Sequence, residues 1–258
     1  MDKYSLYVPN FLPCKEYFVP EKNQACPGCG LALAVRQTYK SLGTAIEKAS
    51  WVSPEDGLSA DAGSGLFGAG RTAVSFLSVP KAAGKLLICF DNEAGGLLSD
   101  ALEKPMIQLA VSQGFSYVAA ACPSYPFDLY DKMNQAMKIS ADAYVHVLCP
   151  CPPGWRFDAD FTVKLGRFAV ESRAFPLYEV GAGAYSLSVK TGKPRPVSDY
   201  LRGQQRFEKL TEQDIAGAQA SVDGAYRNLE ARVQHYLDAV VSDLYAPWRA
   251  CLKGAHNV

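Results

Sequence analysis

The chain has 258 residues, which is enough for one large domain with a buried core, and its 26 basic residues are balanced by 26 acidic ones. Apolar residues make up 48% of the sequence and charged residues 20%, so the composition is that of a globular protein and gives no basic surface for nucleic acid or a membrane. A net charge of zero also lowers the solubility of a free chain, so we expect it to be buried in an oligomer.

Residues 1–25 are expected to form an irregular N-terminal arm. The arm lacks the basic start and apolar stretch of a signal peptide, and no apolar run approaches the roughly 18 residues that a membrane span needs. In a chain that is not exported, the eight cysteines are expected to be reduced thiols or metal ligands. We therefore predict a cytoplasmic protein that contacts neither nucleic acid nor membrane.

After the arm, helical and strand patterns alternate. A helix is predicted over residues 31–42, because apolar residues recur there at helical spacing and Gly43 can end it. Short apolar strands are predicted over 85–90, 116–121 and 143–148, and they are followed by helices over 99–113, 125–138 and around 161–172. Apolar strands separated by helices indicate parallel βαβ units with helices on both faces of the sheet.

The C-terminal third has a different pattern. Residues 176–189 are predicted to form a two-stranded ribbon that turns at 181–183, and residues 211–244 a long amphipathic helix. Its first residues, Thr-Glu-Gln-Asp, predict a capping arrangement. We divide the chain into the arm (1–25), an α/β domain (26–190) and a C-terminal helical extension (191–258).

Two cysteine motifs are the sharpest chemical signals. Cys26-Pro-Gly-Cys29 precedes the first helix, and Cys149-Pro-Cys151 directly follows the third strand. The carboxyl ends of parallel strands meet at the ligand crevice of an open α/β sheet, so thiols there are placed for a cofactor. From spacing alone, the first motif fits a redox pair, zinc or an iron–sulfur cluster, and the second equally fits structural cysteines in a proline turn.

A second signal is Gly63-Ser64-Gly65, followed by Asn92 at the end of the first predicted strand. A glycine-flanked turn at a helix start and an amide at a strand end can hold a diphosphate through a divalent ion. The same pattern also fits an ordinary connection between a helix and a strand.

Together these residues resemble the β subunits of pyruvate and other 2-oxoacid:ferredoxin oxidoreductases. The first cysteine motif with the residues after it, segment 115–155 and segment 193–207 are all similar to that family, from about Lys15 to the end. The family oxidatively decarboxylates a 2-oxoacid on thiamine diphosphate, passes electrons through a [4Fe–4S] cluster and forms an acyl-CoA. The resemblance implies a thiamine-diphosphate-binding fold, which is doubly wound, mostly parallel and here trimmed near its first strands.

The resemblance also implies a set of cluster ligands. Cys26, Cys29 and Cys151 fall on three of the four ligand positions, while the Thr-Gly-Cys element that carries the remaining one is missing. Cys149 and Cys122 stand where the family commonly has Ser, so either could complete a four-thiolate site.

The same comparison implies a degenerate diphosphate site. Gly63, Ser64 and Gly65 fall on the family's Gly-Asp-Gly, and Asn92 falls on the amide that closes the Mg²⁺ site. Ser64 removes a carboxylate from the metal shell, and the family's long loop after Glu93 is absent. We therefore expect thiamine diphosphate and Mg²⁺ to bind weakly or not at all, and we assign no catalytic residue.

Three functions follow from this interpretation. In the first, the chain pairs with α- and γ-type subunits and relays electrons through its cluster to ferredoxin or another carrier. In the second, it is a catalytically competent β subunit that uses thiamine diphosphate for oxidative decarboxylation to acyl-CoA. In the third, it is a cofactor-free structural pseudoenzyme. Iron content separates the first from the third, and bound thiamine separates the second from both. His146, inside a strand, is expected to be packed rather than catalytic.

Overall fold

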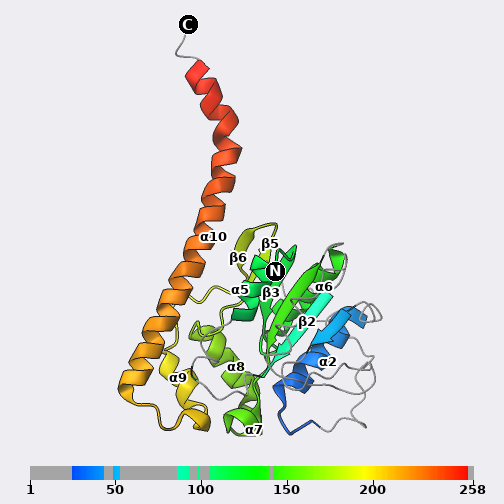
Figure 1. Cartoon of the computed structure of the whole chain (residues 1–258), viewed down its shortest axis with the longest axis vertical. Coiled ribbons are helices and arrows are strands. Elements are labelled where there is room, and N and C mark those ends of the chain that lie inside the picture. The colour runs from blue at the N-terminus through cyan, green and yellow to red at the C-terminus, as the bar shows by residue number, and fades with distance from the viewer. Residues whose placement is uncertain are drawn as a thin grey trace, which may run out of the picture.

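The computed structural model describes residues 25–43, 49–52, 86–92, 98, 105–139 and 142–254, with the backbone alone after residue 237 and within 49–52. A twisted sheet lies at the centre, helices cover it, and a long C-terminal helix runs along one side (Figure 1).

The described part of the sheet has six strands in the order β1-β2-β4-β3-β5-β6. The first four strands in this order are parallel to one another, β5 is antiparallel to β3, and β6 is antiparallel to β5. The strands are β1 (Ala49–Val52), β2 (Leu86–Asp91), β3 (Tyr117–Ala121), β4 (Ala143–Leu148), β5 (Tyr178–Gly181) and β6 (Ala184–Leu187). His146 on β4 is paired with Cys89 on β2 at one edge of the strand and with Ala120 on β3 at the other.

Helices cover both faces of the sheet because the strand order reverses. From β2 the chain crosses over the position of β4 to β3, and it then returns through another helix to β4. Right-handed crossovers in opposite directions place their helices on opposite faces. One core accordingly contains α2 (Gly30–Leu42) and α6 (Pro126–Lys138), and the other contains α5 (Pro105–Ser112) and α8 (Thr162–Glu171).

The central strands are buried along their whole length. Every residue of β3 and β4 is buried, as are the first five of β2. A strand covered on both faces needs apolar residues at consecutive positions rather than at alternating ones. This requirement explains the continuous apolar runs in the sequence.

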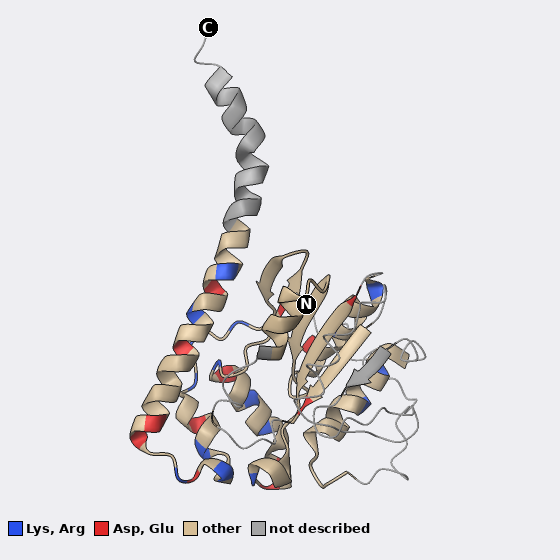
Figure 2. Cartoon of the chain, in the orientation of Figure 1, with Lys and Arg blue, Asp and Glu red and all other residues tan. Residues whose placement is uncertain are grey.

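The C-terminal extension packs against the second core. Helix α9 (Val197–Arg202) precedes α10 (Glu212–Gly254), which lies beside β6 and α9. The backbone N–H of Asp214 donates to Thr211 Oγ1 (3.2 Å), and that of Thr211 donates to Asp214 Oδ2 (2.8 Å), so the predicted capping arrangement is confirmed. Basic and acidic residues follow one another along the described part of α10, in contrast to the largely uncharged sheet (Figure 2).

The α/β fold with a mostly parallel sheet and helices on both faces is confirmed, as are the ribbon and the long helix. The structure adds β1 and the one-turn helix α7 (Pro152–Trp155), and α10 runs past the predicted end at residue 244. Residues 1–24 of the N-terminal arm and residues 99–104 of the helix predicted over 99–113 lie outside the described residues. Among the described helices, none combines the length and the apolar character needed to cross a membrane.

Candidate functional site

The first cysteine motif forms a tight turn at the start of α2. The backbone N–H of Cys29 donates to the carbonyl of Cys26 (3.1 Å), and Gly28 has φ +68°. Proline followed by a residue with positive φ is the signature of a type II turn, so Pro27 and Gly28 set this conformation. Cys29 is the N-cap of α2, and its Sγ accepts the backbone N–H of Ala32 (3.5 Å).

This turn is fixed on both sides by distant segments. The backbone N–H of Gly30 donates to the carbonyl of Pro150 (3.0 Å), and a Cβ at residue 30 would lie only 2.5 Å from that oxygen. On the other side Thr162 Oγ1 donates to the carbonyl of Gly28 (2.5 Å). The predicted meeting of the two cysteine motifs is therefore present at the level of the backbone.

The thiols themselves differ in burial. Cys26 is exposed, Cys29 and Cys151 are half-buried, and Cys149 and Cys122 are fully buried at the carboxyl ends of β4 and β3. Cys149 lies in the core with α2 and α6, and Cys29 packs against that core. Cys122 lies in the core of the opposite face, against which Cys151 packs.

The fit of these residues to an iron–sulfur cluster is incomplete in the arrangement seen here. Burial raises the pKa of the Cys149 thiol, and the nearby Cys122, Asp91 and Cys29 raise that pKa further. The Sγ of Cys149 is turned toward the carbonyl of Val147 (3.4 Å). Across the residues that the structure describes, no three His, Cys, Asp or Glu side chains are gathered as a metal site. The thiolate-forming residues suit a cluster, but their side chains must turn and lose protons to bind one.

The end of β2 is tied to the same region. Trp155 Nε1 donates to the carbonyl of Asn92 (2.6 Å), and the backbone N–H of Cys149 donates to the carbonyl of Asp91 (2.7 Å). Trp155 is completely buried, and the guanidinium of Arg206 lies 4.7 Å from its ring centroid. Asn92, the expected Mg²⁺ amide, is therefore held beside the second cysteine motif. Trp155 was not predicted to take part.

The other residues of the expected diphosphate site, Gly63, Ser64 and Gly65, lie outside the described residues. Asn92 is nearly buried, with 8% of its surface exposed. The prediction of a degenerate thiamine diphosphate site thus remains a prediction.

A buried histidine lies in the strands just behind this edge of the sheet. His146 Nε2 is 3.2 Å from Asp91 Oδ2, outside good hydrogen-bond geometry, and its Nδ1 is 2.9 Å from the hydroxyl of Tyr144. Burial acts to lower the pKa of His146, but Cys89 and Asp91 outweigh it and raise the pKa to about 10. The expectation that His146 is packed is confirmed. The raised pKa of this histidine was not expected from the sequence.

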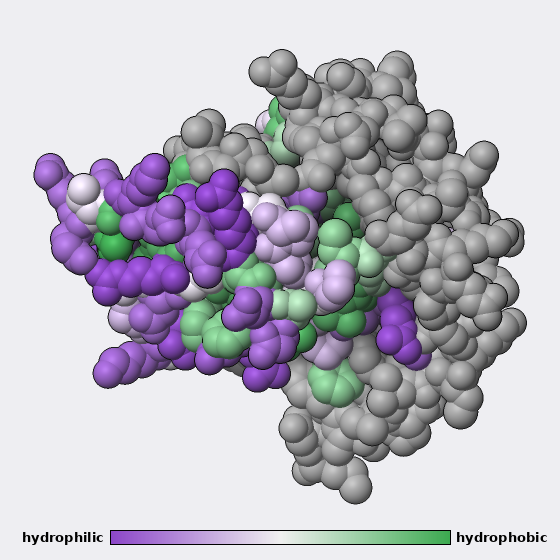
Figure 3. Space-filling model, turned by 90° about the horizontal axis from the view of Figure 1, so that it is seen from below, coloured by the Kyte–Doolittle hydropathy of each residue, from purple (hydrophilic) through white to green (hydrophobic). Residues whose placement is uncertain are grey.

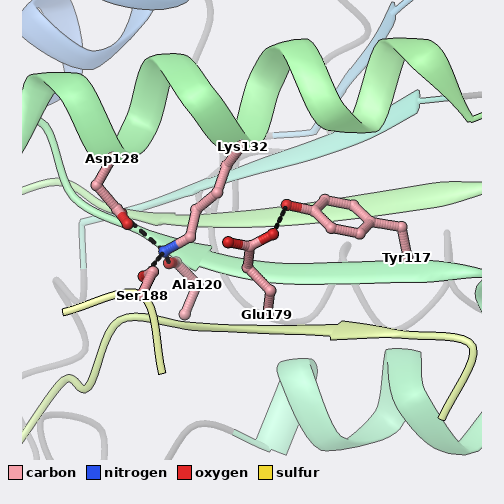
Figure 4. Close-up of polar contacts among 6 residues, drawn as sticks. All are labelled: Tyr117, Ala120, Asp128, Lys132, Glu179 and Ser188. Atoms are coloured by element: carbon pink, nitrogen blue, oxygen red, sulfur yellow. Dashed lines mark hydrogen bonds and ion pairs between the residues drawn. The ribbon is translucent and has the colours of Figure 1, made fainter. Parts of the chain in front are cut away.

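A polar network on α6 was missed by the sequence reasoning. Lys132 is 1% exposed, and its Nζ donates to Ala120 O (2.6 Å), Asp128 Oδ2 (2.7 Å) and Ser188 Oγ (2.8 Å). Figure 4 shows these three acceptors around the ammonium group, with the bond from Tyr117 to Glu179 beside them. The spacing of Asp128 and Lys132 by four residues was the available signal.

Figure 3 views the molecule from the end at which α7 and α9 lie in Figure 1. Hydrophilic residues gather toward one side of this face, and hydrophobic ones appear between them nearer its middle. The described part of this face is therefore neither uniformly hydrophilic nor uniformly hydrophobic.

Comparison with known proteins gives the relatives of the chain. It is 39% identical over 124 residues to pyruvate synthase subunit PorB of Methanocaldococcus jannaschii, which covers 48% of this chain and 42% of the relative. It is 32% identical over 133 residues to ketoisovalerate oxidoreductase subunit VorB of Pyrococcus horikoshii, covering 50% and 43% respectively. The chain is thus a relative of the PorB and VorB subunits. It spans less than half the length of these curated relatives.

PorB of Methanothermobacter marburgensis is 36% identical over 145 residues, which are 56% of this chain and 45% of that protein. A solved 2-oxoglutarate:ferredoxin oxidoreductase from Magnetococcus marinus aligns with 59% of this chain and 78% of its own, at a TM-score of 0.35 and 17% identity. No protein-family model matches the chain.

Proposed function

We propose that this chain is a β-type subunit of a 2-oxoacid:ferredoxin oxidoreductase-like complex and that it holds a [4Fe–4S] cluster for electron transfer. The observation that carries the proposal is the docking of the Cys26–Cys29 turn on the Cys149–Cys151 turn through Gly30 and Pro150. The similarity to PorB and VorB subunits supports the assignment to such a complex.

We propose Cys149 as the fourth ligand beside Cys26, Cys29 and Cys151. Cys149 lies in the core against which Cys29 packs, whereas Cys122 lies in the core against which Cys151 packs. Cys149 also shares a short turn with Cys151, so one rearrangement of that turn can present both sulfurs. A bound cluster would supply a one-electron carrier, and the four thiolates would set its position between the partner subunits.

We further propose that this chain alone does not bind thiamine diphosphate usefully. A hydroxyl at Ser64 brings no negative charge to Mg²⁺, and Asn92 can offer only a neutral oxygen. The backbone carbonyl of Asn92 accepts a hydrogen bond from Trp155, so the side-chain amide is the group of Asn92 that we expect to face a metal ion. Under this proposal the thiamine-dependent chemistry belongs to another site of the complex.

Iron and sulfide analysis of the anaerobically purified chain, with its visible spectrum, tests the cluster. We expect about four irons and four sulfides per chain and a broad visible absorption. Cys29→Ser and Cys149→Ser should each abolish that absorption, whereas the matched control Cys122→Ser should keep it. If the absorption is kept in Cys149→Ser but lost in Cys122→Ser, the fourth ligand is Cys122 and not Cys149. A purified chain that contains no iron would refute the cluster.

Titration calorimetry with Mg²⁺ and thiamine diphosphate tests the second proposal. We expect no binding at micromolar cofactor, and partial recovery in Ser64→Asp because a carboxylate restores charge to the metal shell. Tight binding by the unmodified chain would favour the catalytically competent subunit instead.

A further inference from the structure

We propose that Cys26 and Cys29 form a reversible disulfide whenever the chain carries no cluster, so that this turn acts as a redox lock on cluster assembly. The inference deepens the proposed function, on which its biological meaning rests, but the bond itself depends only on the geometry of the turn.

The turn brings the backbone of the two residues close to the separation that a disulfide needs. A β-turn closed by the hydrogen bond from Cys29 N–H to the carbonyl of Cys26 keeps its end Cα atoms within about 7 Å, and disulfides need about 4.4–6.8 Å. Gly28 adopts the positive φ that the turn needs, and its carbonyl is held by Thr162. Closing the bond therefore requires side-chain rotation and little movement of the backbone.

The two sulfurs differ in their exposure to solvent and in the hydrogen bonds that orient them. Cys26 is exposed and open to a small oxidant, while Cys29 is half-buried and its Sγ is oriented by the N–H of Ala32. Cys149 is buried and turned toward the carbonyl of Val147, and the half-buried Cys151 packs against the core of the opposite face. The hydrogen-bonded turn therefore makes Cys29 the expected partner of Cys26.

The reaction with a low-molecular-weight disulfide balances in two exchanges. The Cys26 thiolate attacks one sulfur of the disulfide, the sulfur–sulfur bond breaks, and one small thiol leaves. The Cys29 thiolate then attacks the Cys26 sulfur of the mixed disulfide and releases the second small thiol. The chain loses two electrons and two protons, both of which end on the two small thiols.

The lock follows from the chemistry of ligation. A cluster binds thiolates and not disulfide sulfurs, so the oxidised turn removes two of the proposed ligands at once. A thiol reductant must open the bond before iron can be bound. The redox state of Cys26 and Cys29 then determines whether the chain can bind a cluster.

The test uses the full-length chain freed of iron by a chelator and equilibrated with mixtures of oxidised and reduced glutathione. Free thiols are alkylated under acid quench, and the tryptic peptide 23–36, which contains Cys26 and Cys29 and no other cysteine, is weighed. We expect this peptide to lack alkylation and to be lighter by two hydrogens in oxidised glutathione, and to be doubly alkylated after dithiothreitol. A peptide that stays alkylatable, or that carries glutathione without the internal bond, would overturn the proposal.

Anaerobic iron and sulfide reconstitution of the same samples tests the lock. The oxidised chain should take up at least about tenfold less iron than the reduced chain, and dithiothreitol should restore uptake. Cys251→Ser, which lies outside both cysteine motifs, is the matched control and should oxidise like the unmodified chain. If the peptide oxidises but neither sample binds iron, the disulfide stands and the cluster fails. If iron binds to the chain but the peptide never oxidises, the cluster stands and this inference fails.

Discussion

Two buried acid–base contacts differ in how completely their hydrogen bonds are satisfied. Lys132 on α6 directs its three ammonium donors to three oxygens within 2.8 Å. His146 on β4 meets Asp91 at 3.2 Å in poor geometry, and Asp91 is 22% exposed. A fully satisfied buried charge anchors a structure, whereas a partly satisfied one near water responds to pH.

The anchoring role predicts the largest effect. Lys132→Met should lower the free energy of unfolding by about 3–5 kcal/mol, because it leaves the carboxylate of Asp128 buried without its partner. Urea denaturation followed by circular dichroism measures the loss. The double variant Lys132→Met/Asp128→Leu should recover part of it, since no uncompensated charge remains. Equal stability of the single variant and the unmodified chain would show that Lys132 is not an anchor.

The pH-responsive role predicts an intermediate effect. The pKa of His146 is about 10 in the folded chain and 6.5 as its ordinary value, so the folded state binds this proton more tightly. The resulting stability is fully present below pH 6.5 and is lost as pH rises through about 10. Over that window the difference in unfolding free energy between the unmodified chain and His146→Gln should shrink by about 1.4 kcal/mol for each pH unit.

This difference should be measured at several pH values in one buffer series. The groups that face residue 146, which are Asp91, Cys89 and Tyr144, are present in both chains, so the comparison isolates the effect of His146. A difference that does not change with pH would mean that His146 is neutral when folded.

The smallest effect is expected at the hydrogen bond between Tyr117 and Glu179, which lies beside the Lys132 network. Tyr117 donates to Glu179 Oε2 (2.6 Å), and Glu179 is half-buried. Tyr117→Phe should cost about 1 kcal/mol, because the carboxylate left behind can be solvated in part. Chemical denaturation resolves this value, and a loss as large as that of Lys132→Met would place Tyr117 inside the anchor instead.

Much of the fold could be predicted because local patterns determine it. The consecutive apolar residues of β2, β3 and β4 predicted buried parallel strands, and α2 was predicted with its end at Gly43. The four-residue strand β1 was missed because it is too short for a periodic signal. For α10, the helical pattern ended earlier than the helix does.

The candidate site could be predicted only in part. The strand-end rule placed the second cysteine motif at the edge of the sheet, and its meeting with the first motif was expected from the family's ligand positions. The bond from Trp155 to Asn92 joins residues 63 positions apart, and Ser188 lies 56 positions from Lys132. Neither pairing has a sequence signal, because each depends on how separate elements pack. The burial of Lys132 was missed since a helical lysine is ordinarily solvated.

The position of β4 between β2 and β3 has a consequence for the order of folding. Strands β3 and β4 with the intervening α6 are contiguous in sequence and form a complete parallel unit, whereas β2 pairs with β4 across a much longer loop. Closing the shorter loop costs less chain entropy, so residues 117–148 are the part of the sheet best placed to nucleate, and β2 docks afterwards. On a ribosome, β2 would be synthesised before β4, and the edge of β2 that pairs with β4 would stay open until β4 has been synthesised.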